Sequence, residues 1–376
     1  VIPKLGYGGA ETGCYDIAHF LSENDCGSFL ATSGGALLKF VKKDKVKLIR
    51  LPVHSKNPLF ILFNTLVLII YIFLFKINII HARSRAPAWS CYFASLITRR
   101  SFVTTFHGTY NFNSNLKKFY NSIMLRAKLT IAGSNFIFGH INENYSEYLN
   151  KEKKLRVIFR GINIDYFNPK NISILKQEKL KQEWGLSSNN FTILLPGRLT
   201  YWKGQEKFIE ALNILIEDFN ITNFRAIILG SNQGRKVYSK KLINLVQRYS
   251  LNKKIKFIQH CNEMPLAYSL ADVVVSASIE PEAFGRVSVE AQSMGKPIIA
   301  SNIGGSKETI INKKTGFLYK HDDPRELAKI LNTVIQLSQD ELKLIGNEGR
   351  KNITKKFDVE TMCQSNLKEY KRLIKN

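Results

Sequence analysis

Short runs of apolar residues alternate with longer amphipathic stretches along most of the chain. In the first half, apolar runs rich in Val, Ile, Leu and Phe predict strands at 28–32, 46–51, 77–81, 102–106, 129–132 and 156–159. The stretches between several of them, such as 10–22 and 86–98, have the period of helices. Strands that alternate with helices favour a parallel sheet with helices on both faces.

This alternation breaks at 160–190, where Gly161, Pro169 and many Lys, Asn and Gln residues predict a linker with a short helix. Predicted strands then resume at 191–195, 225–229, 255–258, 272–276 and 297–300, and 359–374 predicts a final amphipathic helix. We expect two α/β domains, at 1–165 and 166–355, followed by a C-terminal helix at 356–376. Ligands of such open sheets collect at the carboxyl ends of the strands.

One uncharged segment, 59–75, is at the short edge of a membrane-spanning length, and only Asn64 and Thr65 interrupt it. The strands expected on either side would belong to one sheet, and a crossing would put them on opposite sides of a membrane. We therefore predict a helix of the first domain whose surplus apolar face is available to a bilayer surface. The first residues lack a signal-peptide pattern and resemble the tail of a strand whose start is missing.

The formal net charge of +25 on 376 residues admits three interpretations: a nucleic-acid partner, an anionic membrane surface, or a solvated basic exterior. Zinc-finger spacing, an aromatic–basic RNA signature and dense arginine tracts are absent from the sequence, so we expect no nucleic-acid partner. The five cysteines are scattered and odd in number. That pattern argues against a disulfide framework or zinc cluster and favours a reducing compartment.

The segment 281–290 carries the most informative chemistry. Glu282 precedes a predicted helix start, Gly285 lies near that start, and Glu290 lies inside the helix. A glycine allows close backbone approach, and free N–H groups at a helix N-terminus attract phosphate. At about 1.5 Å per residue, Phe284 and Glu290 lie roughly 9 Å apart. One carboxylate could meet the sugar of a nucleoside diphosphate sugar and the other its ribose; the alternative is a solvated helix with two unrelated acids.

Two further loops follow predicted strands of the second domain. Gly197, Arg198 and Lys203 lie between the strand at 191–195 and a helix at 205–215, where fixed cations can hold a diphosphate leaving group. The alternative is an exposed basic loop. Gly304 and Gly305 precede Glu308, which could orient this loop or bind a sugar hydroxyl, or could simply be an acid at a helix start.

Candidate residues of the first domain lie at its strand ends. Gly8 and Gly9 belong to a glycine cluster that lacks the third glycine of a dinucleotide fingerprint, so we expect a loop on the acceptor side of the site. His107 follows the strand at 102–106 and could hydrogen-bond a reacting sugar, or be a packed loop histidine. Arg83 and Arg85 follow the strand at 77–81 and suit an anionic acceptor, such as a phosphorylated lipid or acidic sugar, or are merely exposed.

The sequence offers no D-x-D pair and no H-E-x-x-H motif, and Asp322 and Asp323 before Pro324 predict a turn and helix cap. We therefore expect no metal and no cofactor. Charge on a leaving diphosphate would be carried by Arg198 and Lys203 together with a helix N-terminus.

These motifs, in this order, resemble the GT-B retaining glycosyltransferases of family 4 over essentially the whole chain. The resemblance rests on Gly8 to Glu11, Phe106 to Gly108, Arg160 to Asp165, Gly197-Arg198 with Lys203-Gly204, Glu282 to Glu290, and Gly304-Gly305 with Glu308. The combination of E-x7-E with G-R-x4-K-G is specific. Residues 81–89 and 197–204 are also similar to bacterial lipopolysaccharide-core glycosyltransferases, and Arg160 stands where the family often has Asn.

The resemblance implies two facing Rossmann-like domains with a cleft between them and a last helix that packs back on the first domain. It further implies that Arg198 and Lys203 contact the donor diphosphate, Glu282 the transferred sugar and Glu290 the ribose. The backbone of Phe284, Gly285, Arg286 and Val287 would line the sugar and phosphate.

The implied function is retaining, metal-independent transfer of a hexose from a nucleotide diphosphate sugar to a saccharide or lipid-linked acceptor, in lipopolysaccharide or other envelope glycan synthesis. His107, Arg198, Lys203 and Glu282 are the expected catalytic residues. We expect a cytoplasmic protein, with peripheral contact to the anionic inner membrane left open. The alternatives are a nucleotide-sugar 2-epimerase of the same fold, and a non-catalytic basic protein that binds membranes or nucleic acid.

Overall fold

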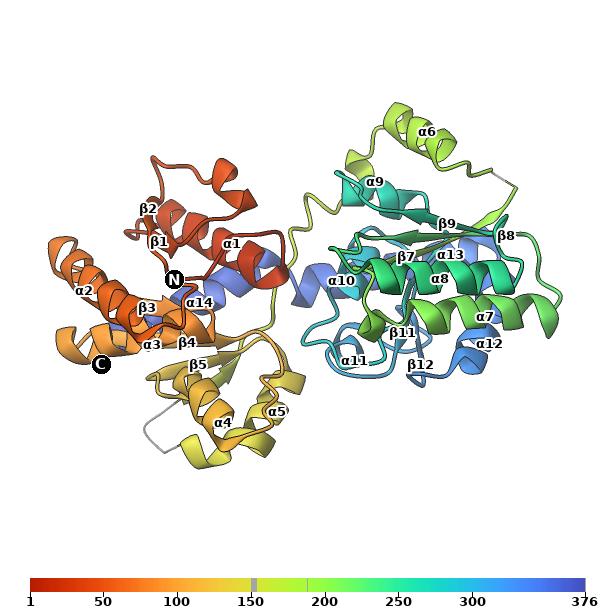
Figure 1. Ribbon diagram of the computed structural model, residues 1–376. Coiled ribbons are helices and arrows are strands. Elements are labelled where there is room, and N and C mark those ends of the chain that lie inside the picture. The colour runs from red at the N-terminus through yellow and green to blue at the C-terminus, as the bar shows by residue number, and fades with distance from the viewer. Residues whose placement is uncertain (150–153, 188, 376) are drawn as a thin grey trace. The chain divides into compact units, whose positions relative to one another are not determined.

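The computed structural model describes residues 1–149, 154–187 and 189–375, which form two compact α/β units (Figure 1). Unit 1 comprises Val1–Gly161 together with Val359–Asn376, and unit 2 comprises Ile162–Asp358. The chain therefore leaves unit 1 after its last strand and returns to it for its last helix.

Unit 2 is built on a six-stranded parallel sheet with the order β12-β11-β10-β7-β8-β9. Its strands are β7 (Phe191–Pro196), β8 (Phe224–Leu229), β9 (Ile255–Ile258), β10 (Val273–Ser276), β11 (Ile298–Ser301) and β12 (Phe317–Tyr319). The strand order reverses between β7 and β10, because the chain runs outward to β9 and then returns to the other side of β7. In open α/β sheets, ligands bind at the carboxyl ends of strands at such a reversal.

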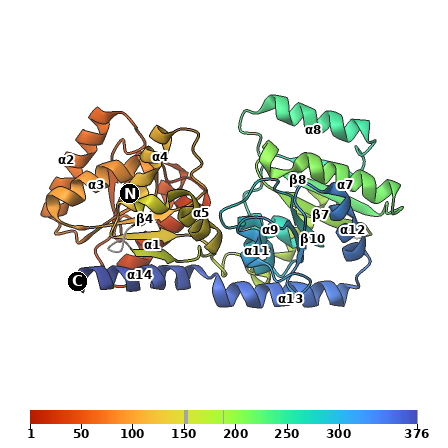
Figure 2. The ribbon, with the colours of Figure 1, turned by 90° about the horizontal axis from the view of Figure 1, so that it is seen from below.

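Helices cover both faces of this sheet (Figure 2). α7, α8 and α12 pack on one face, and α10 and α13 pack together on the other. Strands β10 and β11 are buried along their whole length, which explains their continuous Val, Ile and Ala sequences. The helices of unit 2 are α6 (Ile174–Glu183), α7 (Gln205–Glu217), α8 (Lys236–Arg248), α9 (Met264–Ser269), α10 (Arg286–Ser293), α11 (Ser306–Thr309), α12 (Pro324–Ile335) and α13 (Gln339–Lys356).

Side-chain caps fix the starts of α12 and α13. The Asp323 carboxylate accepts a hydrogen bond from the backbone N–H of Glu326 at 2.9 Å, which confirms the predicted cap before Pro324. Ser338 and Glu341 form a reciprocal capping box at α13.

Unit 1 contains a four-stranded parallel sheet, β3-β4-β5-β6, and a two-stranded parallel sheet, β1-β2. Its strands are β1 (Phe29–Thr32), β2 (Lys47–Arg50), β3 (Ile79–Ala82), β4 (Ser101–Phe106), β5 (Leu129–Ala132) and β6 (Lys154–Val157). The expectation that 46–51 and 77–81 share one sheet is wrong, because β2 and β3 belong to different sheets. Extended residues at the start of the chain lie between β1 and β3: Ile2 N–H donates to the carbonyl of Ala31, and Arg83 N–H donates to the carbonyl of Val1.

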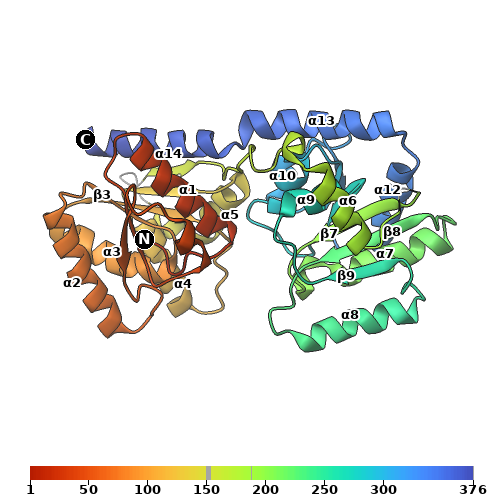
Figure 3. The same ribbon diagram turned by 90° about the horizontal axis from the view of Figure 1, so that it is seen from above.

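Helices α1 and α14 pack together on one face of unit 1, and α2 and α3 pack together on the other (Figures 2 and 3). Tyr370 of α14 lies with its hydroxyl 2.5 Å from Nδ1 of His81, which ties this helix to β3. The helices are α1 (Gly9–Glu23), α2 (Pro58–Leu74), α3 (Arg85–Thr98), α4 (Asn115–Ser122), α5 (Asn135–Tyr145) and α14 (Val359–Lys375).

The apolar segment predicted as a helix forms α2, whose start is capped by Asn57 through a 2.9 Å hydrogen bond from Leu59 N–H. Among the described helices, none combines the length and the apolar character that a membrane crossing requires.

Candidate active site

The candidate donor site of unit 2 is formed by the segments that follow β7 and β10, at the point where the strand order reverses. The first segment runs from Gly197 through a short 3-10 turn, Tyr201–Lys203, into α7. The second runs from Ala277 to Gly285 and enters α10. Residues that are about 80 positions apart in the sequence therefore meet at one edge of the sheet.

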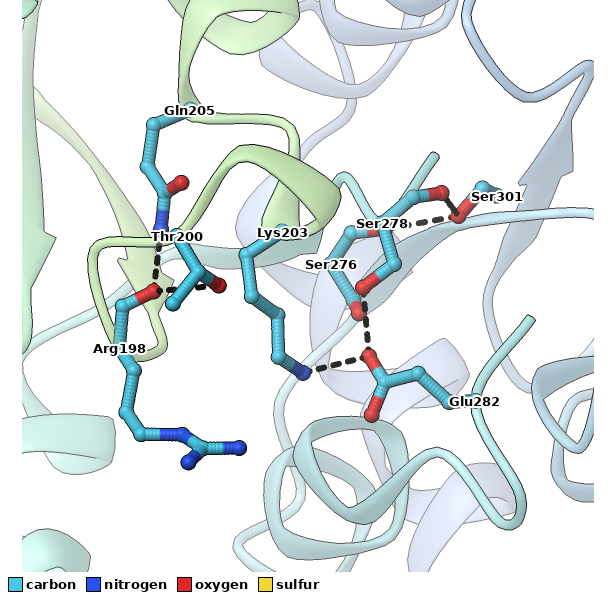
Figure 4. A network of polar contacts seen from close by, with 8 residues as sticks. All are labelled: Arg198, Thr200, Lys203, Gln205, Ser276, Ser278, Glu282 and Ser301. Atoms are coloured by element: carbon cyan, nitrogen blue, oxygen red, sulfur yellow. Dashed lines mark hydrogen bonds and ion pairs between the residues drawn. The ribbon is translucent and has the colours of Figure 1, made fainter. Parts of the chain in front are cut away.

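Lys203 and Glu282 form an ion pair at the centre of this edge (Figure 4). The Lys203 ammonium lies 2.7 Å from Oε1 of Glu282, and the two side chains are only 12% and 11% exposed. Ser278 donates a second hydrogen bond, of 2.6 Å, to the same oxygen. The other oxygen, Oε2, accepts no hydrogen bond from the described part of the chain, so it can accept one from a ligand.

The surroundings of Glu282 keep its carboxylate charged. Burial by itself would raise the pKa of this side chain, but the charge of Lys203, the hydrogen bonds from Lys203 and Ser278, and the charge of Arg198 outweigh it. The pKa of Glu282 consequently lies below its ordinary value.

Arg198 supplies the second cation of this group. Its backbone carbonyl accepts a 2.9 Å hydrogen bond from Nε2 of Gln205, which holds the loop against the start of α7. The exposed side chain extends beside Lys203 (Figure 4), and no carboxylate within the described ranges pairs with it. A planar guanidinium with five N–H donors and an adjacent ammonium form a site suited to phosphate oxygens.

Two glycines bring the loops into contact. Gly204 has a φ of +68°, and a Cβ placed there would lie 1.8 Å from the carbonyl oxygen of Ala277. A Cβ at Gly305 would lie 2.4 Å from Cα of Phe284, and Gly305 N–H donates to the carbonyl of Glu282 at 2.7 Å. The Gly304-Gly305 loop therefore supports the backbone that carries Glu282.

Glu290 lies on α10 and is almost fully buried, at 6% exposure. Its Oε1 lies 2.5 Å from Nε of Arg286, one helical turn earlier, and its Oε2 accepts a 2.7 Å hydrogen bond from the hydroxyl of Tyr268 on α9. Burial raises the pKa of Tyr268 well above its ordinary value, and the charge of Glu290 adds to this effect. The predicted donor contact Arg286 thus binds Glu290 in this structure.

The remaining predicted donor residues surround this group. Gly285 takes a left-handed conformation and immediately precedes α10. The side chains of Phe284 and Val287 are buried, and Phe284 packs against Phe357 with ring centroids 5.7 Å apart. A ligand would therefore meet the backbone of these residues. Glu308 is half-buried on α11.

A hollow of about 210 Å³ opens in unit 2 beside α6 and α9, and Tyr166 and Glu263 contribute to its lining. Burial raises the pKa of Tyr166, with further contributions from Glu263 and Glu290. Tyr166, which lines the hollow, therefore lies within electrostatic reach of Glu290.

In unit 1, His107 follows β4 as predicted. Both of its ring nitrogens are buried, and neither has a hydrogen-bond partner within residues 1–149, 154–187 and 189–375. Burial lowers the pKa of His107 well below its ordinary value, and the charges of Arg83 and Arg160 lower it further. The ring is therefore neutral near pH 7 and can either donate or accept a hydrogen bond.

Arginines surround this histidine. Arg83 is 5% exposed, and no carboxylate of the described residues pairs with it. Arg160, for which the sequence predicted no role, donates to the backbone carbonyl of His107. Arg85 donates to Oδ1 of Asn121 at 2.8 Å and lies 4.3 Å above the ring of Tyr110. Arg83 is thus the better candidate for an anionic ligand, because the side chain of Arg85 is already bound.

The predicted glycine loop is at the start of α1, with Gly8 as the N-cap and Gly9 as the first helical residue. The Arg83 guanidinium also reaches α1, because a Cβ at Gly13 would lie 3.1 Å from it. Gly8, Gly9 and Arg83, which were predicted on the acceptor side, therefore lie around one end of this helix.

Sequence reasoning missed the residues that hold the charged groups in place. Ser278 gave a weak signal, since it lies at the end of a strand four positions before Glu282. Tyr268 and Gln205 gave none, and Arg160 lies in a motif of the family resemblance that left its role open. All five cysteine thiols are free, and no group of three or more His, Cys, Asp or Glu side chains among the described residues is arranged to hold a metal ion.

Two Rossmann-like units are the architecture of the GT-B glycosyltransferases, the fold that this chain shares with its structural neighbours. The sequence profile of the family described as "Glycosyl transferases group 1" matches residues 176–352, and that of "Glycosyltransferase Family 4" matches residues 7–166. The chain belongs to the group 1 glycosyltransferases.

Solved structures resemble the chain over its whole length. A glycosyltransferase from Rickettsia africae is 36% identical, with a TM-score of 0.90, over 100% of this chain and 98% of that one. HepE from Anabaena, in complex with UDP and glucose, is 25% identical, with a TM-score of 0.81, over 99% of each chain. The capsular polysaccharide biosynthesis glycosyltransferase CapM of Staphylococcus aureus is 27% identical over 235 residues, 59% of this chain and 58% of CapM. The matched region spans about half the length of the curated relatives.

Proposed function

We propose that this glycosyltransferase moves a hexose from a nucleotide diphosphate sugar to a hydroxyl of a saccharide or lipid-linked acceptor, with retention of anomeric configuration and without a metal ion. The observation that carries the proposal is the group formed by Arg198, Lys203 and Glu282 at the strand-order reversal of unit 2. It combines two cations for a diphosphate with one carboxylate for a sugar.

The hydrogen-bonding capacity of the group supports this assignment. A lysine ammonium has three N–H donors, and Lys203 gives one of them to Glu282. The other two, together with the guanidinium of Arg198, are available for diphosphate oxygens. Oε2 of Glu282 is available for a sugar hydroxyl at the same time, so binding a donor does not require the Lys203–Glu282 pair to break.

In the proposed reaction, the bond between the anomeric carbon and the β-phosphate oxygen breaks while the acceptor oxygen bonds to the same face of that carbon. The acceptor's proton moves to the leaving phosphate, which becomes the free nucleoside diphosphate. Negative charge grows on the phosphate during bond breaking, so Arg198 and Lys203 stabilise the transition state more than the bound donor. No covalent nucleophile on the protein is invoked.

Glu290 is proposed to bind the donor ribose. Both of its oxygens already accept one hydrogen bond, from Arg286 and from Tyr268, and a carboxylate has about four acceptor positions in total. A ribose hydroxyl can therefore be added without losing either bond. The UDP in the HepE structure makes a uridine nucleotide the first donor to test.

The acceptor is proposed to belong to envelope glycan synthesis, as lipopolysaccharide or capsule does, and the name of the CapM relative supports this class. The buried, unpaired Arg83 beside His107 supports an acceptor that carries negative charge. The proposal places the protein in the cytoplasm, in peripheral contact with the anionic face of the inner membrane.

The donor proposal is tested by thermal unfolding of the protein with UDP, UDP-glucose, GDP-mannose and ADP-glucose, each at 1 mM. For a donor with a Kd of about 10 μM, mass action raises the unfolding free energy by about 2.7 kcal/mol, which shifts the midpoint by roughly 5–10 °C. Lys203→Ala should abolish this shift, whereas Lys240→Ala, on the exposed side of α8, should retain it.

Equal shifts in Lys203→Ala and the wild type would refute the diphosphate role of Lys203. Incubation of the protein with the stabilising donor, in the absence of an acceptor, tests the epimerase alternative. An epimerised sugar among the products would assign the protein as an epimerase instead of a transferase. The anomeric proton of the transferred sugar, observed by NMR with EDTA present, tests retention and metal independence together.

A further inference from the structure

Helix α2 buries its polar side chains and exposes most of its apolar ones, which is the reverse of an ordinary surface helix. Its two polar residues, Asn64 and Thr65, are 1% and 3% exposed, whereas most of its large apolar side chains face solvent. The neighbouring helix α3 adds three more exposed apolar residues. These side chains, each 40–75% exposed, form what we call the α2–α3 apolar surface: Leu59, Phe60, Leu62, Phe63, Leu66, Ile70, Phe73 and Leu74 of α2, with Phe93, Leu96 and Ile97 of α3.

Specific hydrogen bonds hold α2 in this orientation. Asn64 donates to the carbonyl of Pro52 at 3.3 Å, and Thr65 bonds the carbonyls of Ile61 at 2.8 Å and Ser90 at 3.4 Å. Turning α2 to bury its apolar face would break the bond of Asn64 to Pro52, in the loop before α2, and the bond of Thr65 to Ser90 of α3. The exposed apolar face is therefore a fixed property of unit 1.

An apolar surface of this size on a globular protein marks a site of interaction. Helix α2 is not expected to span a membrane. Its 17 residues extend about 25 Å, which is less than the hydrocarbon core of about 30 Å, and its polar side is packed against α3. A helix that buries only one face suits the plane of a lipid interface.

The charge of the surrounding chain indicates which class of partner this surface binds. From residue 45 to residue 142 the sequence contains no Asp or Glu and thirteen cations: Lys45, Lys47, Arg50, Lys56, Lys76, Arg83, Arg85, Arg99, Arg100, Lys117, Lys118, Arg126 and Lys128. Lys56 precedes α2, and Lys76 follows it. Lys45 and Lys118 pair with Glu23 and Glu147, and Arg83 is buried, but Lys56 and Lys76 have no carboxylate partner among the described residues. A partner for this region is therefore expected to be apolar where it meets the two helices and negatively charged near the two ends of α2.

Aromatic side chains border the same surface. Trp89 of α3 contacts Phe93, Phe119 and Tyr120, with ring centroids about 6 Å apart. Cations lie over this border and over the far end of α2: the Lys56 ammonium is 5.7 Å from the centroid of the Tyr120 ring, and the Lys47 ammonium is 4.2 Å from that of Phe75, which follows α2. Trp, Tyr and basic residues around an apolar face are the composition of protein surfaces at the membrane–water boundary.

We propose that the α2–α3 apolar surface inserts into the interface of an anionic lipid bilayer and anchors the protein as a monotopic membrane protein. This deepens the membrane contact in the proposed function by naming the surface, and it does not depend on the transfer reaction. Anionic lipid headgroups would meet the flanking lysines, and acyl chains would meet the leucines and phenylalanines of α2.

The test is flotation of the full chain with vesicles of phosphatidylcholine alone and with 30% phosphatidylglycerol. The wild type should bind the anionic vesicles, and high salt should weaken this binding. The triple variant Leu62→Gln, Leu66→Gln and Ile70→Gln should bind at least about tenfold more weakly, because each change removes apolar area from the inserted face. Glutamine keeps the helix propensity of α2 high.

A matched control replaces three exposed apolar residues of unit 2: Val237→Gln, Ile243→Gln and Leu344→Gln. It should bind vesicles as the wild type does. Lys56→Gln should weaken binding to anionic vesicles by about fivefold and leave binding to neutral ones unchanged. Hydrogen exchange in 58–74 should slow in the wild type when anionic vesicles are added.

Three results would overturn the proposal: no binding of the wild type to anionic vesicles, equal binding by the triple variant, or a dimer that the triple variant abolishes while vesicles have no effect. The last result would assign the surface to contact between two copies of the chain. Donor-induced thermal stabilisation should be the same in the triple variant and the wild type, so a failure of the donor proposal is distinguishable from a failure of this one.

Discussion

Replacement of Lys203 by methionine tests the central ion pair of the donor site. Methionine keeps an unbranched stem, which in Lys203 lies 3.6 Å from the position of a Cβ on Gly197, and removes only the charge. Glu282 then retains the hydrogen bond from Ser278 but loses its cation. The variant thus leaves a nearly buried carboxylate without a counter-ion.

Breaking a buried pair by removing one partner costs about 3–5 kcal/mol of unfolding free energy. The remaining Ser278 bond and the charge of Arg198 place the expected cost for Lys203→Met near the lower end, at about 3 kcal/mol at pH 7.5. Lys241 is the matched control, since it lies 2.6 Å from Glu206 in the same unit but is 61% exposed. Lys241→Met should cost less than about 1 kcal/mol.

The pH dependence separates a charge effect from a packing effect. In the wild type the folded-state pKa of Glu282 is lowered, so its contribution to stability is present above the ordinary value of 4.5 and is lost as the pH falls through the folded pKa. In Lys203→Met, burial is expected to raise that pKa instead. The carboxylate then destabilises the fold above the raised pKa and is relieved by protonation below it.

The measurement is urea unfolding at pH 7.5 and pH 5.0, followed by the fluorescence of Trp184 and Trp202 in unit 2. The deficit of Lys203→Met should be smaller at pH 5.0 by at least about 1 kcal/mol, the equivalent of roughly one pKa unit. The double variant Lys203→Met with Glu282→Gln should recover at least half of the deficit at pH 7.5. An equal deficit at both pH values, with no recovery in the double variant, would refute the charge argument.

Three further predictions concern backbone geometry and buried cations. Gly204→Ala should lower the unfolding free energy by at least about 2 kcal/mol more than Gly185→Ala, because both glycines have positive φ but only the first has a carbonyl in the way. The pKa of His81 is lowered well below 6.5 by burial, so between pH 7.5 and 5.5 the wild type should lose stability relative to His81→Gln, with a slope of up to about 1.4 kcal/mol per pH unit. Arg83→Met should raise the unfolding free energy by about 1 kcal/mol or more, because it removes a buried unpaired charge. As a control, Arg156→Met, an exposed position on β6, should change the unfolding free energy by less than about 0.5 kcal/mol. Urea unfolding midpoints measure all three predictions.

The alternation of strands and helices was predictable because parallel strands buried on both faces are continuous apolar runs. β5 and β9 have the predicted bounds, and the other predicted strands differ by one or two residues at one end or at both. The three-residue strand β12 was missed, since Phe317–Tyr319 is too short to display a period. The division of unit 1 into two sheets was also missed, because hydrogen bonding of residues 1–3 between β1 and β3 is a tertiary arrangement that local sequence does not encode.

The candidate site was predictable to the extent that its residues follow strands. Lys203 and Glu282 were placed correctly at strand ends, but their 2.7 Å contact depends on β7 and β10 being neighbours, which is a property of the sheet order. Partners that hold the charges, such as Tyr268 on α9, come from elements without a motif. Periodicity and motif spacing identify the charged groups of the candidate site; they do not identify the groups that position them.

The two carboxylates of the E-x7-E motif differ in the way that their proposed roles require. Both hydrogen bonds to Glu282 end on Oε1, so Oε2 is open to a ligand, and the paired cation is the one proposed to bind the diphosphate as well. Glu290 instead uses one oxygen for Arg286 and the other for Tyr268, so any ligand must share an oxygen that is already bound. An oxygen without protein partners can adjust its hydrogen bond to a sugar whose charge changes during the reaction. A carboxylate whose two oxygens are both bound is suited to a ribose that stays in place. The asymmetry of these hydrogen bonds is therefore a structural argument that Glu282 acts in turnover and Glu290 in nucleotide binding.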